Sequence, residues 1–340
     1  MPAALAAAPE LGPWLDELAE LGPPPSPLVL PPAAEAAAVL ARVGVPGDDV
    51  RAIVAALPSP DGDPDRWWVL ERAYHRLTAG LAEGRDDAAT AGPAADGRGP
   101  WGDWPVPPPS LGPGWEWFHV HLHLAAVPDV IRWHRAHGIP AEVTWATLGN
   151  LGRNVPLHRQ LHGGPGLHAP GWLVLHARGA LFELGRLQYR RARATWTLPG
   201  APFATGDPVL DVHIPPTGPL APAAVDWSFR AARTFFGRHF PDDDSGSGVC
   251  TSWLLDPQLG AYLPDDSNIL RFQQRFQLDD GWSWPGDDSI VEFVFRRMGA
   301  PVDALPRRTT LERAVVDHIR DGGHWQTRRG WCAVPPRELT

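Results

Sequence analysis

Residues 207–256 read DPVLDVHIPPTGPLAPAAVDWSFRAARTFFGRHFPDDDSGSGVCTSWLLD, and the rest of the chain is arranged around them. The first apolar run, 209–214, alternates enough to predict a half-buried strand. The proline-rich turn 215–220 ends that strand, and Pro222 suits the first turn of a helix. An apolar stripe at steps of three and four residues predicts this helix, and residues 249–255 form a second apolar run. The predicted order is therefore strand, loop, helix, strand.

The composition limits the class of protein. The chain has 340 residues, enough for one large domain or two ordinary ones. Its 44% apolar content and 17 Trp predict a substantial core, and its 40 Pro and 35 Gly predict long loops. The net charge is −9 and no Lys is present, so no basic block favours nucleic acid. With only Cys250 and Cys332, neither a disulfide framework nor a paired CxxC zinc site is possible.

The N-terminal part of the chain predicts helices. Residues 1–85 read as short amphipathic helices separated by prolines, and residues 64–81 place their large apolar side chains on one face. The first residues have neither a basic region nor a long apolar run, and no stretch reaches the length of a membrane span. We therefore expect a cytoplasmic protein. Residues 83–113 read as a linker, so we predict a helical domain with its linker over 1–110 and a second domain over 111–335.

The second domain mixes strands and helices. Residues 115–124 fit either a strand, with His119, His121 and His123 on one face, or a helix, with only His119 and His123 sharing a face. The remaining predicted elements are helices at 128–137, 142–162, 257–262 and 267–276, strands at 172–177, 181–189, 289–297 and 324–334, a hairpin turn at 178–179, and a helix that Thr309 and Glu312 begin with a capping box.

Several segments together resemble one bacterial protein family. They are WATLGNLGR at 145–153, LGRLQY at 184–189, HIP at 213–215, AVDWSFRAARTFFGRHFP at 224–241, SWLLDPQL at 252–259, DSNILRFQQRF at 266–276 and PRRTTLERAVVDHIRDGGHW at 306–325. Members of this family carry an N-acyltransferase N-terminal domain followed by a GNAT-like C-terminal domain. The resemblance runs from about residue 115 to residue 331 of the chain.

The resemblance implies a fold and an activity. The fold is α/β, of the α+β type: a GNAT-like mixed, twisted sheet, splayed in the middle and flanked by helices, whose C-terminal part spans about 167–335. If residues 115–124 form a strand, the order of elements matches this fold. The implied activity is an acyl-CoA-dependent N-acyltransferase that moves an acyl group to an amine of a small molecule or a protein.

The resemblance also implies where acyl-CoA binds. The thioester would lie between strands 209–214 and 249–255, and the pyrophosphate would meet the start of the helix. Because three prolines in this loop have no N–H and no basic residue lies nearby before Arg230, an acyl donor on a carrier protein stays open. Asn268 either binds ligand with Arg271 or caps a helix. The predicted binding residues are Ile214, Thr217, Gly218, Leu220, Ala221 and Asn268.

Two side chains are candidates for the general base. His213 comes first because it ends the strand beside the loop and histidine titrates near neutral pH. Its alternative is a histidine that is merely hydrogen-bonded at a strand end. Glu183 comes second, since a carboxylate in an apolar strand must be paired or have a raised pKa. Its alternative is a salt bridge to Arg186, Arg190 or Arg191.

Further candidates follow the second central strand. Tyr262 lies roughly where GNAT enzymes often place a tyrosine acid, and its alternative is a packing role. Ser252 shares one strand face with Cys250, and we interpret Cys250 as a small buried side chain rather than a nucleophile.

Two other functions stay open. A non-catalytic GNAT-like binding or regulatory protein would account for the proline-filled loop. A His-ligated metalloenzyme would use His119, His121 and His123 if they lie on a strand, although no carboxylate falls at the spacing of a cupin-type site. Our prediction includes acyl-CoA as co-substrate and no metal.

Overall fold

The computed structural model describes residues 5, 8–81, 101–243 and 245–335 of the chain. It divides into two compact units, residues 1–182 and residues 183–340. The first unit thus includes residues 111–182, which we had assigned to the second domain. The linker predicted over 83–113 lies outside the described residues up to position 100.

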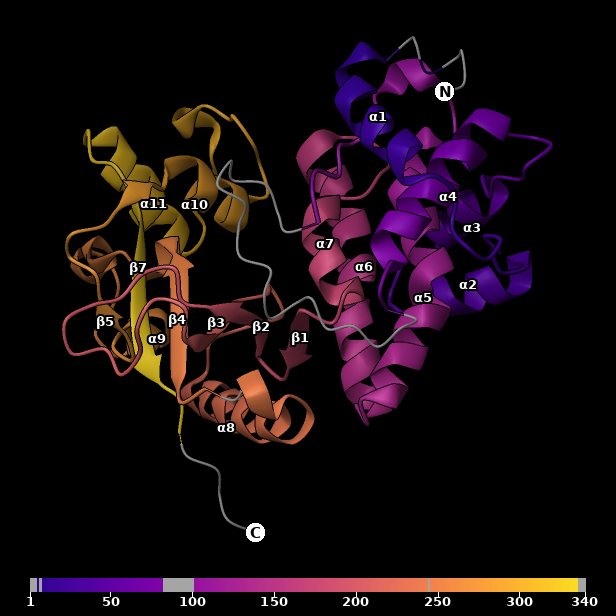
Figure 1. The fold of residues 1–340 in the computed structure, drawn as a ribbon. Coiled ribbons are helices and arrows are strands. Elements are labelled where there is room, and N and C mark those ends of the chain that lie inside the picture. The colour runs from indigo at the N-terminus through magenta and orange to yellow at the C-terminus, as the bar shows by residue number, and fades with distance from the viewer. Residues whose placement is uncertain (1–4, 6–7, 82–100, 244, 336–340) are drawn as a thin grey trace. The chain divides into compact units, whose positions relative to one another are not determined.

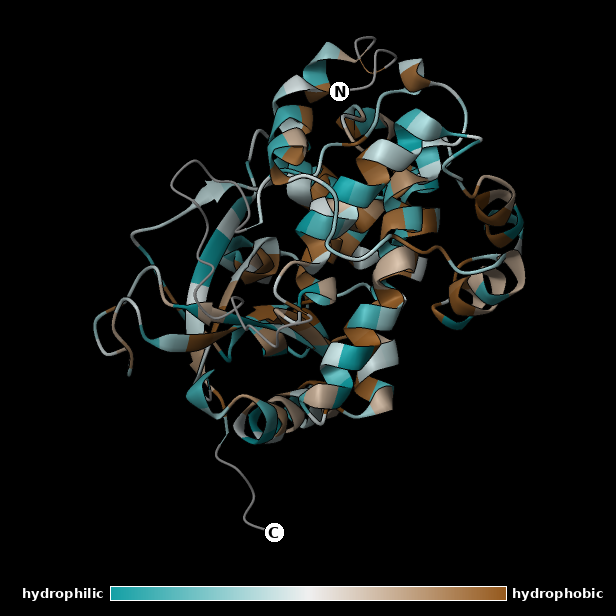
Figure 2. Ribbon diagram, turned by 45° about the vertical axis from the view of Figure 1, so that its right-hand side comes forward, coloured by the Kyte–Doolittle hydropathy of each residue, from teal (hydrophilic) through white to brown (hydrophobic). Residues whose placement is uncertain are grey.

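The first unit is helical. Its α-helices are α1 (Gly12–Leu21), α2 (Ala33–Arg42), α3 (Gly47–Ala55), α4 (Pro64–Thr78), α5 (Phe118–Ala136), α6 (Ala141–His162) and α7 (Pro170–Ala177) (Figure 1). In Figure 2 most of these helices carry hydrophobic and hydrophilic residues side by side along their length, as amphipathic helices do. Among the described residues no helix is long and apolar enough to cross a membrane.

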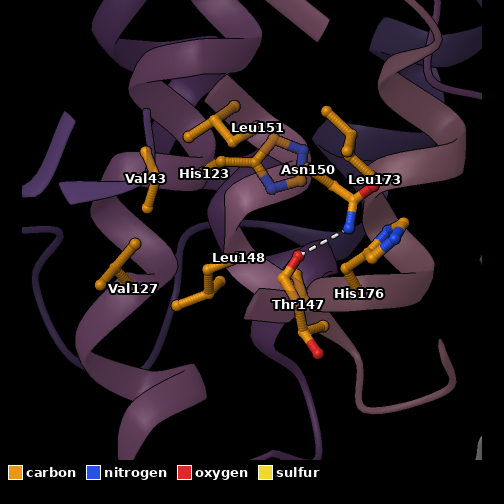
Figure 3. Close-up of a pocket in the computed structure, with 10 residues that line it drawn as sticks. Val43, His123, Val127, Thr147, Leu148, Asn150, Leu151, Leu173 and His176 are labelled. Carbon is orange, nitrogen blue, oxygen red and sulfur yellow. Dashed lines mark hydrogen bonds between the residues drawn. The ribbon is translucent and has the colours of Figure 1, made fainter. Parts of the chain in front are cut away.

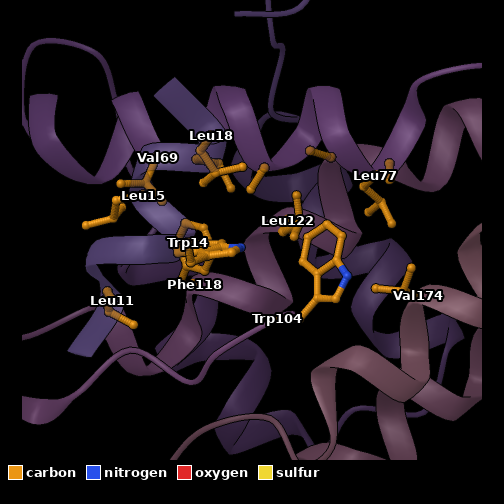
Figure 4. Close-up of a cluster of buried hydrophobic side chains, with 14 of the residues drawn as sticks. Leu11, Trp14, Leu15, Leu18, Val69, Leu77, Trp104, Phe118, Leu122 and Val174 are labelled. Atoms are coloured by element: carbon orange, nitrogen blue, oxygen red, sulfur yellow. The ribbon is translucent and has the colours of Figure 1, made fainter. Parts of the chain in front are cut away.

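Two apolar clusters hold the helical unit together. In the first, Trp14 of α1 meets Phe118 of α5 edge-on, with 6.0 Å between the ring centroids, and Val69 and Leu77 of α4 pack into the same cluster (Figure 4). The second cluster joins α2, α3, α5 and α6, and it contains Leu40, Ile53, Val120 and Leu151. Helix α5 contributes to both clusters and is therefore the centre of this unit.

In this unit the structure decides one segment that the sequence had left open and corrects one strand prediction. Residues 115–117 form a 3₁₀ turn, and α5 follows it directly and continues through Pro128, where we had expected a helix to begin. Residues 172–177 belong to α7 rather than to a strand. Residues 118–127 of α5 are all buried. A helix that is buried on every side has no polar stripe, so its period cannot be told from that of a strand.

The second unit contains a mixed sheet. Its elements are β1 (Leu181–Leu184), which begins at the unit boundary, β2 (Leu187–Arg193), β3 (Pro208–His213), α8 (Pro222–His239), β4 (Ser247–Ser252), α9 (Asn268–Gln273), β5 (Gln277–Leu278), β6 (Trp284–Pro285), α10 (Asp287–Phe295), α11 (Thr310–Arg320) and β7 (Gln326–Ala333). The strand order is β1-β2-β3-β4-β7-β5, and β6 pairs with β7. Strands β3 and β4 run parallel, whereas β2 with β3 and β4 with β7 are antiparallel.

Most predicted elements of this unit are confirmed. The central order of strand, loop, helix and strand is present as β3, α8 and β4 (Figure 1). Thr309 and Glu312 form the predicted capping box at the start of α11. Two predictions were wrong: residues 289–297 lie mainly in α10, and the hairpin turns at 185–186 instead of 178–179.

Helix α8 is fixed to one face of the sheet. Phe229 and Phe236 meet the ring of Tyr189 edge-on, at 5.9 and 6.5 Å between centroids. Ser228 donates a hydrogen bond to the carbonyl of Leu184 and accepts one from the Tyr189 hydroxyl at 3.1 Å. Burial raises the pKa of Tyr189, so this hydroxyl stays a donor. The side chains that alternate with Tyr189 along β2, and their partners on β3, therefore lie on the face away from α8.

The parallel pair β3 and β4 separates along its length. Each strand has six residues, but the register of this pair covers two positions, Leu210 with Gly248 and Asp211 with Val249. Beyond them the described residues of β3 and β4 are not paired with each other. This is the splayed sheet that the resemblance implied, and the split opens beside His213.

Candidate functional site

The last residue of β3, His213, lies in a row of polar side chains. Asp211 is two residues earlier in the strand and so points to the same face. In the antiparallel register Gln188 is opposite His213 and Arg190 is opposite Asp211. His213 Nε2 lies 3.1 Å from Asp211 Oδ2, and Arg190 Nε lies 3.2 Å from the same oxygen. One face of β2 and β3 thus holds a carboxylate between a histidine and an arginine.

The two neighbours keep Asp211 ionised. Burial by itself would raise the pKa of its carboxyl group. The charges of His213 and Arg190, both in close contact with the carboxylate, outweigh burial, and the pKa of Asp211 is lowered below its ordinary value. The site therefore contains a fixed negative charge beside the histidine ring.

Glu183, the second candidate base, is connected to the same row. Gln188 Nε2 donates a hydrogen bond of 2.9 Å to Glu183 Oε2, and both side chains are buried. Because Gln188 is opposite His213, the Glu183 carboxylate lies on the histidine's face of the sheet. The structure thus brings His213 and Glu183, the two candidate bases, onto one face.

The three arginines named as possible partners of Glu183 also make other contacts. Arg190 pairs with Asp211, and Arg191 pairs with Asp243. Arg186 donates hydrogen bonds to three backbone carbonyls of the proline-rich loop, at 3.0 Å to Pro219, 2.8 Å to Pro215 and 2.7 Å to Gly218.

We had predicted no basic residue near this loop, and Arg186 corrects that prediction. It follows Gly185, whose φ of +75° belongs to a tight turn that places the next side chain beside the loop. Burial lowers the pKa of Arg186. The turn between β1 and β2 therefore fixes the loop that precedes α8.

The predicted phosphate-binding positions lie in this loop and at the start of α8. Thr217 and Gly218 are exposed, Ile214 is half-buried and Leu220 is buried. The N–H of Thr217 donates to the Pro215 carbonyl at 2.8 Å, so it is used within the loop. Ala221 is the N-cap of α8 and has no side-chain cap among the described residues. Pro222 in the first turn of α8 has no N–H, and this end of the helix carries the partial positive charge of a helix start.

Ser252, the last residue of β4, and Tyr262, which follows the strand, have structural contacts. Ser252 Oγ accepts a hydrogen bond of 3.1 Å from the Leu254 N–H and caps a short 3₁₀ helix. The hydroxyl of Tyr262 lies 3.0 Å from His318 Nδ1, and its ring packs against Trp325. Their catalytic roles remain predictions.

Two more side chains near these segments have structural explanations. Ser267, one residue before Asn268, caps α9, which corrects our capping prediction for Asn268. Burial, and next the charge of Asp211, raise the pKa of the Cys250 thiol well above its usual range. Cys250 is therefore a neutral thiol, as we had interpreted it.

The three histidines of α5 do not converge on one point. His119 Nε2 lies 2.8 Å from the Pro105 carbonyl, and His121 Nε2 lies 2.9 Å from the Ile53 carbonyl. His123 lines a cavity of about 20 Å³ among α5, α6 and α7, together with Thr147, Asn150 and His176 (Figure 3). In a helix, residues two apart point in different directions, so the strand-based metal site is wrong. Across the described residues no group of three or more His, Cys, Asp or Glu could hold a metal ion.

The cavity beside His123 has room for about one water molecule. Its walls are otherwise apolar, with Val43, Val127, Leu148, Leu151 and Leu173 shown around the ring in Figure 3. This cavity of the helical unit is too small for an acyl chain, so it is not a substrate-binding site.

Comparison with known protein families shows to which class of protein the chain belongs. Residues 34–179 match the N-acyltransferase N-terminal domain, and residues 181–332 match the GNAT-like C-terminal domain. Together the two matches cover nearly the whole described chain. No curated protein matches the chain.

Solved structures are similar over the full length. The chain is 42% identical to an acyltransferase in complex with decanoyl-CoA, with a TM-score of 0.86 over 98% of this chain and 99% of that one. It is also 42% identical to an acyltransferase in complex with decanoyl-CoA and teicoplanin, with a TM-score of 0.85 over 96% of both chains. A mutant acyltransferase in complex with octanoyl-CoA is 40% identical, with a TM-score of 0.86 over 98% of both chains.

The chain therefore belongs to the family of acyltransferases that join an N-acyltransferase N-terminal domain to a GNAT-like C-terminal domain. The predicted fold class and the predicted enzyme class are confirmed. This family assignment replaces the metalloenzyme and the non-catalytic binding protein as alternatives. The predicted acyl-CoA co-substrate agrees with the ligands that the similar structures hold.

Proposed function

We propose that this acyltransferase moves a medium-chain acyl group from acyl-CoA to an amine of a glycopeptide, with His213 as the general base. The donor follows from the similar structures, which hold decanoyl-CoA or octanoyl-CoA. The acceptor class follows from those that hold teicoplanin or its 10C form. None of these structures gives support to an acyl carrier protein as donor. Acyl-CoA is a cytoplasmic metabolite, which agrees with the location that we expect for the enzyme.

One observation of this chain supports the proposal most. Strands β3 and β4 part after Asp211 and Val249, and His213 is the last residue of β3 at this opening. A split between these two strands gives a thioester access to the polar edge of each strand. A histidine at that position is placed to manage the one proton of the reaction.

The reaction needs the protein to carry one proton, from the amine nitrogen to His213 and from His213 to the departing sulfur. The amine nitrogen attacks the thioester carbonyl, and the His213 ring takes a proton from this nitrogen as the C–N bond forms. The tetrahedral intermediate then collapses, the C–S bond breaks, and the CoA sulfur leaves and takes up the proton. The products are an amide and CoA with a free thiol.

The phosphates of the donor would meet the first turn of α8. Its N–H groups and partial positive charge favour an anion there. The prolines of the preceding loop add no N–H, but Arg186 holds three carbonyls of the same loop and keeps them turned toward its guanidinium. In this proposal Arg186 shapes the loop while Thr217, Gly218, Ala221 and α8 contact the donor.

The test combines binding with turnover. Titration of the full chain with decanoyl-CoA should raise its melting temperature, since a ligand at about 100 times its Kd stabilises the fold by roughly 2.7 kcal/mol. With a deacylated glycopeptide as acceptor, we expect release of free CoA and an acylated product in the mass spectrum.

The variant His213→Ala should lower kcat by about 10² to 10⁴ while decanoyl-CoA still raises the melting temperature. The matched control is His324→Ala, since His324 is an exposed histidine paired with Asp287 and should be dispensable. Full activity of His213→Ala would remove His213 as the base. No turnover with any amine would contradict the proposed acceptor class.

A further inference from the structure

An exposed tryptophan lies close to the loop that precedes α8. Trp227 is in the second turn of this helix, and 55% of its surface is exposed. Among the described residues its indole stacks on no other ring. A single exposed aromatic side chain is common on protein surfaces, and it is the surroundings of Trp227 that indicate a ligand.

Trp227 is held against the turn between β1 and β2. Ser228, the next residue of α8, donates to the Leu184 carbonyl and accepts a hydrogen bond of 3.2 Å from the Leu187 N–H. These two bonds fix the turn at Gly185, where a Cβ would lie 2.3 Å from Cζ3 of the indole. Because this residue is glycine, the indole lies against the backbone of the turn and has a fixed place there.

Arg186 brings a positive charge to the same turn. Among the described residues every hydrogen bond of its guanidinium goes to a backbone carbonyl of the loop 215–219. These bonds use three of the five N–H groups and leave one on each terminal nitrogen. Since the accepting oxygens carry no full charge, the loop holds a half-buried cation one residue from the glycine that Trp227 covers.

We propose that Trp227 and Arg186 form the binding site for the nucleotide half of the acyl-CoA donor, with the adenine stacked on the indole and the phosphates facing the guanidinium. This inference rests on the proposed function, because it extends the donor site described there. It adds a stacking residue and a second role for Arg186, which also shapes the loop.

The chemistry of the two side chains fits this ligand. A nucleobase stacks on an aromatic face, and a phosphate accepts charge-assisted hydrogen bonds from a guanidinium. CoA carries an adenine and several phosphates, whereas the phosphopantetheine arm of a carrier protein has no base. The site therefore selects CoA thioesters over carrier-protein thioesters.

The test compares three donors with the same amine acceptor: decanoyl-CoA, decanoyl-phosphopantetheine, which has a phosphate but no base, and decanoyl-pantetheine, which has neither. Trp227→Ala should lower kcat/KM for decanoyl-CoA at least about fivefold and leave kcat/KM for the two shorter donors unchanged. Trp227→Tyr keeps an aromatic face and should recover most of this loss. The matched control is Trp284→Ala on β6, which removes another exposed tryptophan and should keep the parent values for all donors.

Arg186→Gln tests the charge. It should lower kcat/KM for both donors that carry phosphate and leave decanoyl-pantetheine unchanged, because only the phosphates meet the guanidinium. Added salt should weaken the use of decanoyl-CoA by the parent more than by Arg186→Gln. If Arg186→Gln does not fold, the donor comparison with Trp227→Ala alone decides.

Adenosine 3′,5′-bisphosphate gives a test that needs no acyl transfer. It should raise the melting temperature of the parent and of Trp284→Ala, and much less that of Trp227→Ala. An equal rise in Trp227→Ala, or an equal loss of kcat/KM with all three donors, would overturn the inference. If the parent acylates no amine, the proposed function falls, and the melting temperatures alone decide whether this site binds the nucleotide.

Discussion

The two units of this enzyme differ in how they bury several of their ionisable groups. The helical unit buries His119, His121, His123 and His134 as neutral rings, and burial lowers their pKa values to about 4, 4, 3 and 3. The sheet unit buries charges in pairs, such as Arg191 with Asp243 and Arg190 with Asp211. Neutral burial avoids the desolvation of an ion but makes the fold sensitive to acid, whereas pairing keeps the charges at the cost of desolvating them.

The largest expected effect is acid unfolding of the helical unit. Above the ordinary histidine pKa of 6.5, the four rings are neutral in the folded and the unfolded chain. As pH falls below 6.5, the unfolded chain binds protons and the folded one does not until pH 4 to 3, so stability is lost across this window. Each ring contributes about 3 to 5 kcal/mol to the loss, and the sum exceeds the stability of a typical domain.

Hydrogen exchange at falling pH checks this expectation unit by unit. Peptides from α5 should lose protection between pH 6 and 4, while peptides from α8 and β4 keep theirs until the carboxylates titrate. The variant His123→Leu removes one titrating ring that has no hydrogen bond to the described residues, so it should shift the loss to lower pH. If both units lose protection together below pH 4, the contrast between them does not hold.

The next effect tests the paired charges of the sheet unit. Asp243 accepts hydrogen bonds from Arg191 and from Arg193, and its side chain is 6% exposed. Asp243→Asn removes the carboxylate that both arginines contact, and breaking a buried pair costs about 3–5 kcal/mol. We expect this loss in denaturant unfolding.

A matched control comes from the other unit. Asp48→Asn breaks the exposed pair with Arg51, and a surface pair contributes about 0–1 kcal/mol. Equal losses for Asp243→Asn and Asp48→Asn would mean that burial of the sheet-unit pair contributes nothing.

A third effect tests close packing in the helical unit. A Cβ added at Gly152 of α6 would lie 2.0 Å from the Val43 carbonyl oxygen, so Gly152→Ala must move backbone. We expect a loss of about 1–3 kcal/mol or more from this overpacking. At Gly149, three residues earlier in α6, the nearest atoms to such a Cβ are 3.7 and 3.9 Å away. Gly149→Ala should therefore stabilise by up to about 1 kcal/mol through helix propensity.

Thermal unfolding of both variants measures the difference. Since the two glycines share one helix, propensity acts equally on them and the contrast reports packing against residues 43 and 44. A stabilised Gly152→Ala would show that the chain at 43–44 can move aside, and the helical unit would then be less tightly packed than its buried clusters indicate.

How much the sequence could predict differs between the same two units. In the sheet unit, β3, α8, β7 and α11 were readable because each has one buried and one solvated side, so its period is visible. In the helical unit, α5 and α7 are buried nearly all round, and the alternation of histidine with apolar residues in α5 resembled a strand. Hydrophobic periodicity therefore does not predict the type of element where tertiary packing buries every face of it.

The residues of the candidate site also differ in how well the sequence predicts them. His213 at the end of a strand was visible from local pattern, and Asp211 on its face follows from the period of two. The contact of Arg186 with the loop was missed because it depends on the positive φ of Gly185. This φ sets the direction of the turn, and the hydrophobic periodicity of the sequence does not predict it. The hydrogen bond of Glu183 to Gln188 likewise depends on the position of that turn.

The smallest expected effect concerns the two cysteine thiols. The sheet unit buries them as neutral groups, as the helical unit buries its histidines. Burial raises the pKa of Cys332 to about 12 and that of Cys250 well above its usual range. Thiol reagents react with the thiolate, so the folded enzyme should react far more slowly than the unfolded chain, in which both cysteines are accessible.

Cys250→Ala should keep its acyl transfer rate, with a loss of stability of about 1 kcal/mol for the small cavity. Rapid labelling of Cys250 in the folded enzyme, or loss of turnover in Cys250→Ala with decanoyl-CoA binding intact, would instead make this thiol part of the chemistry.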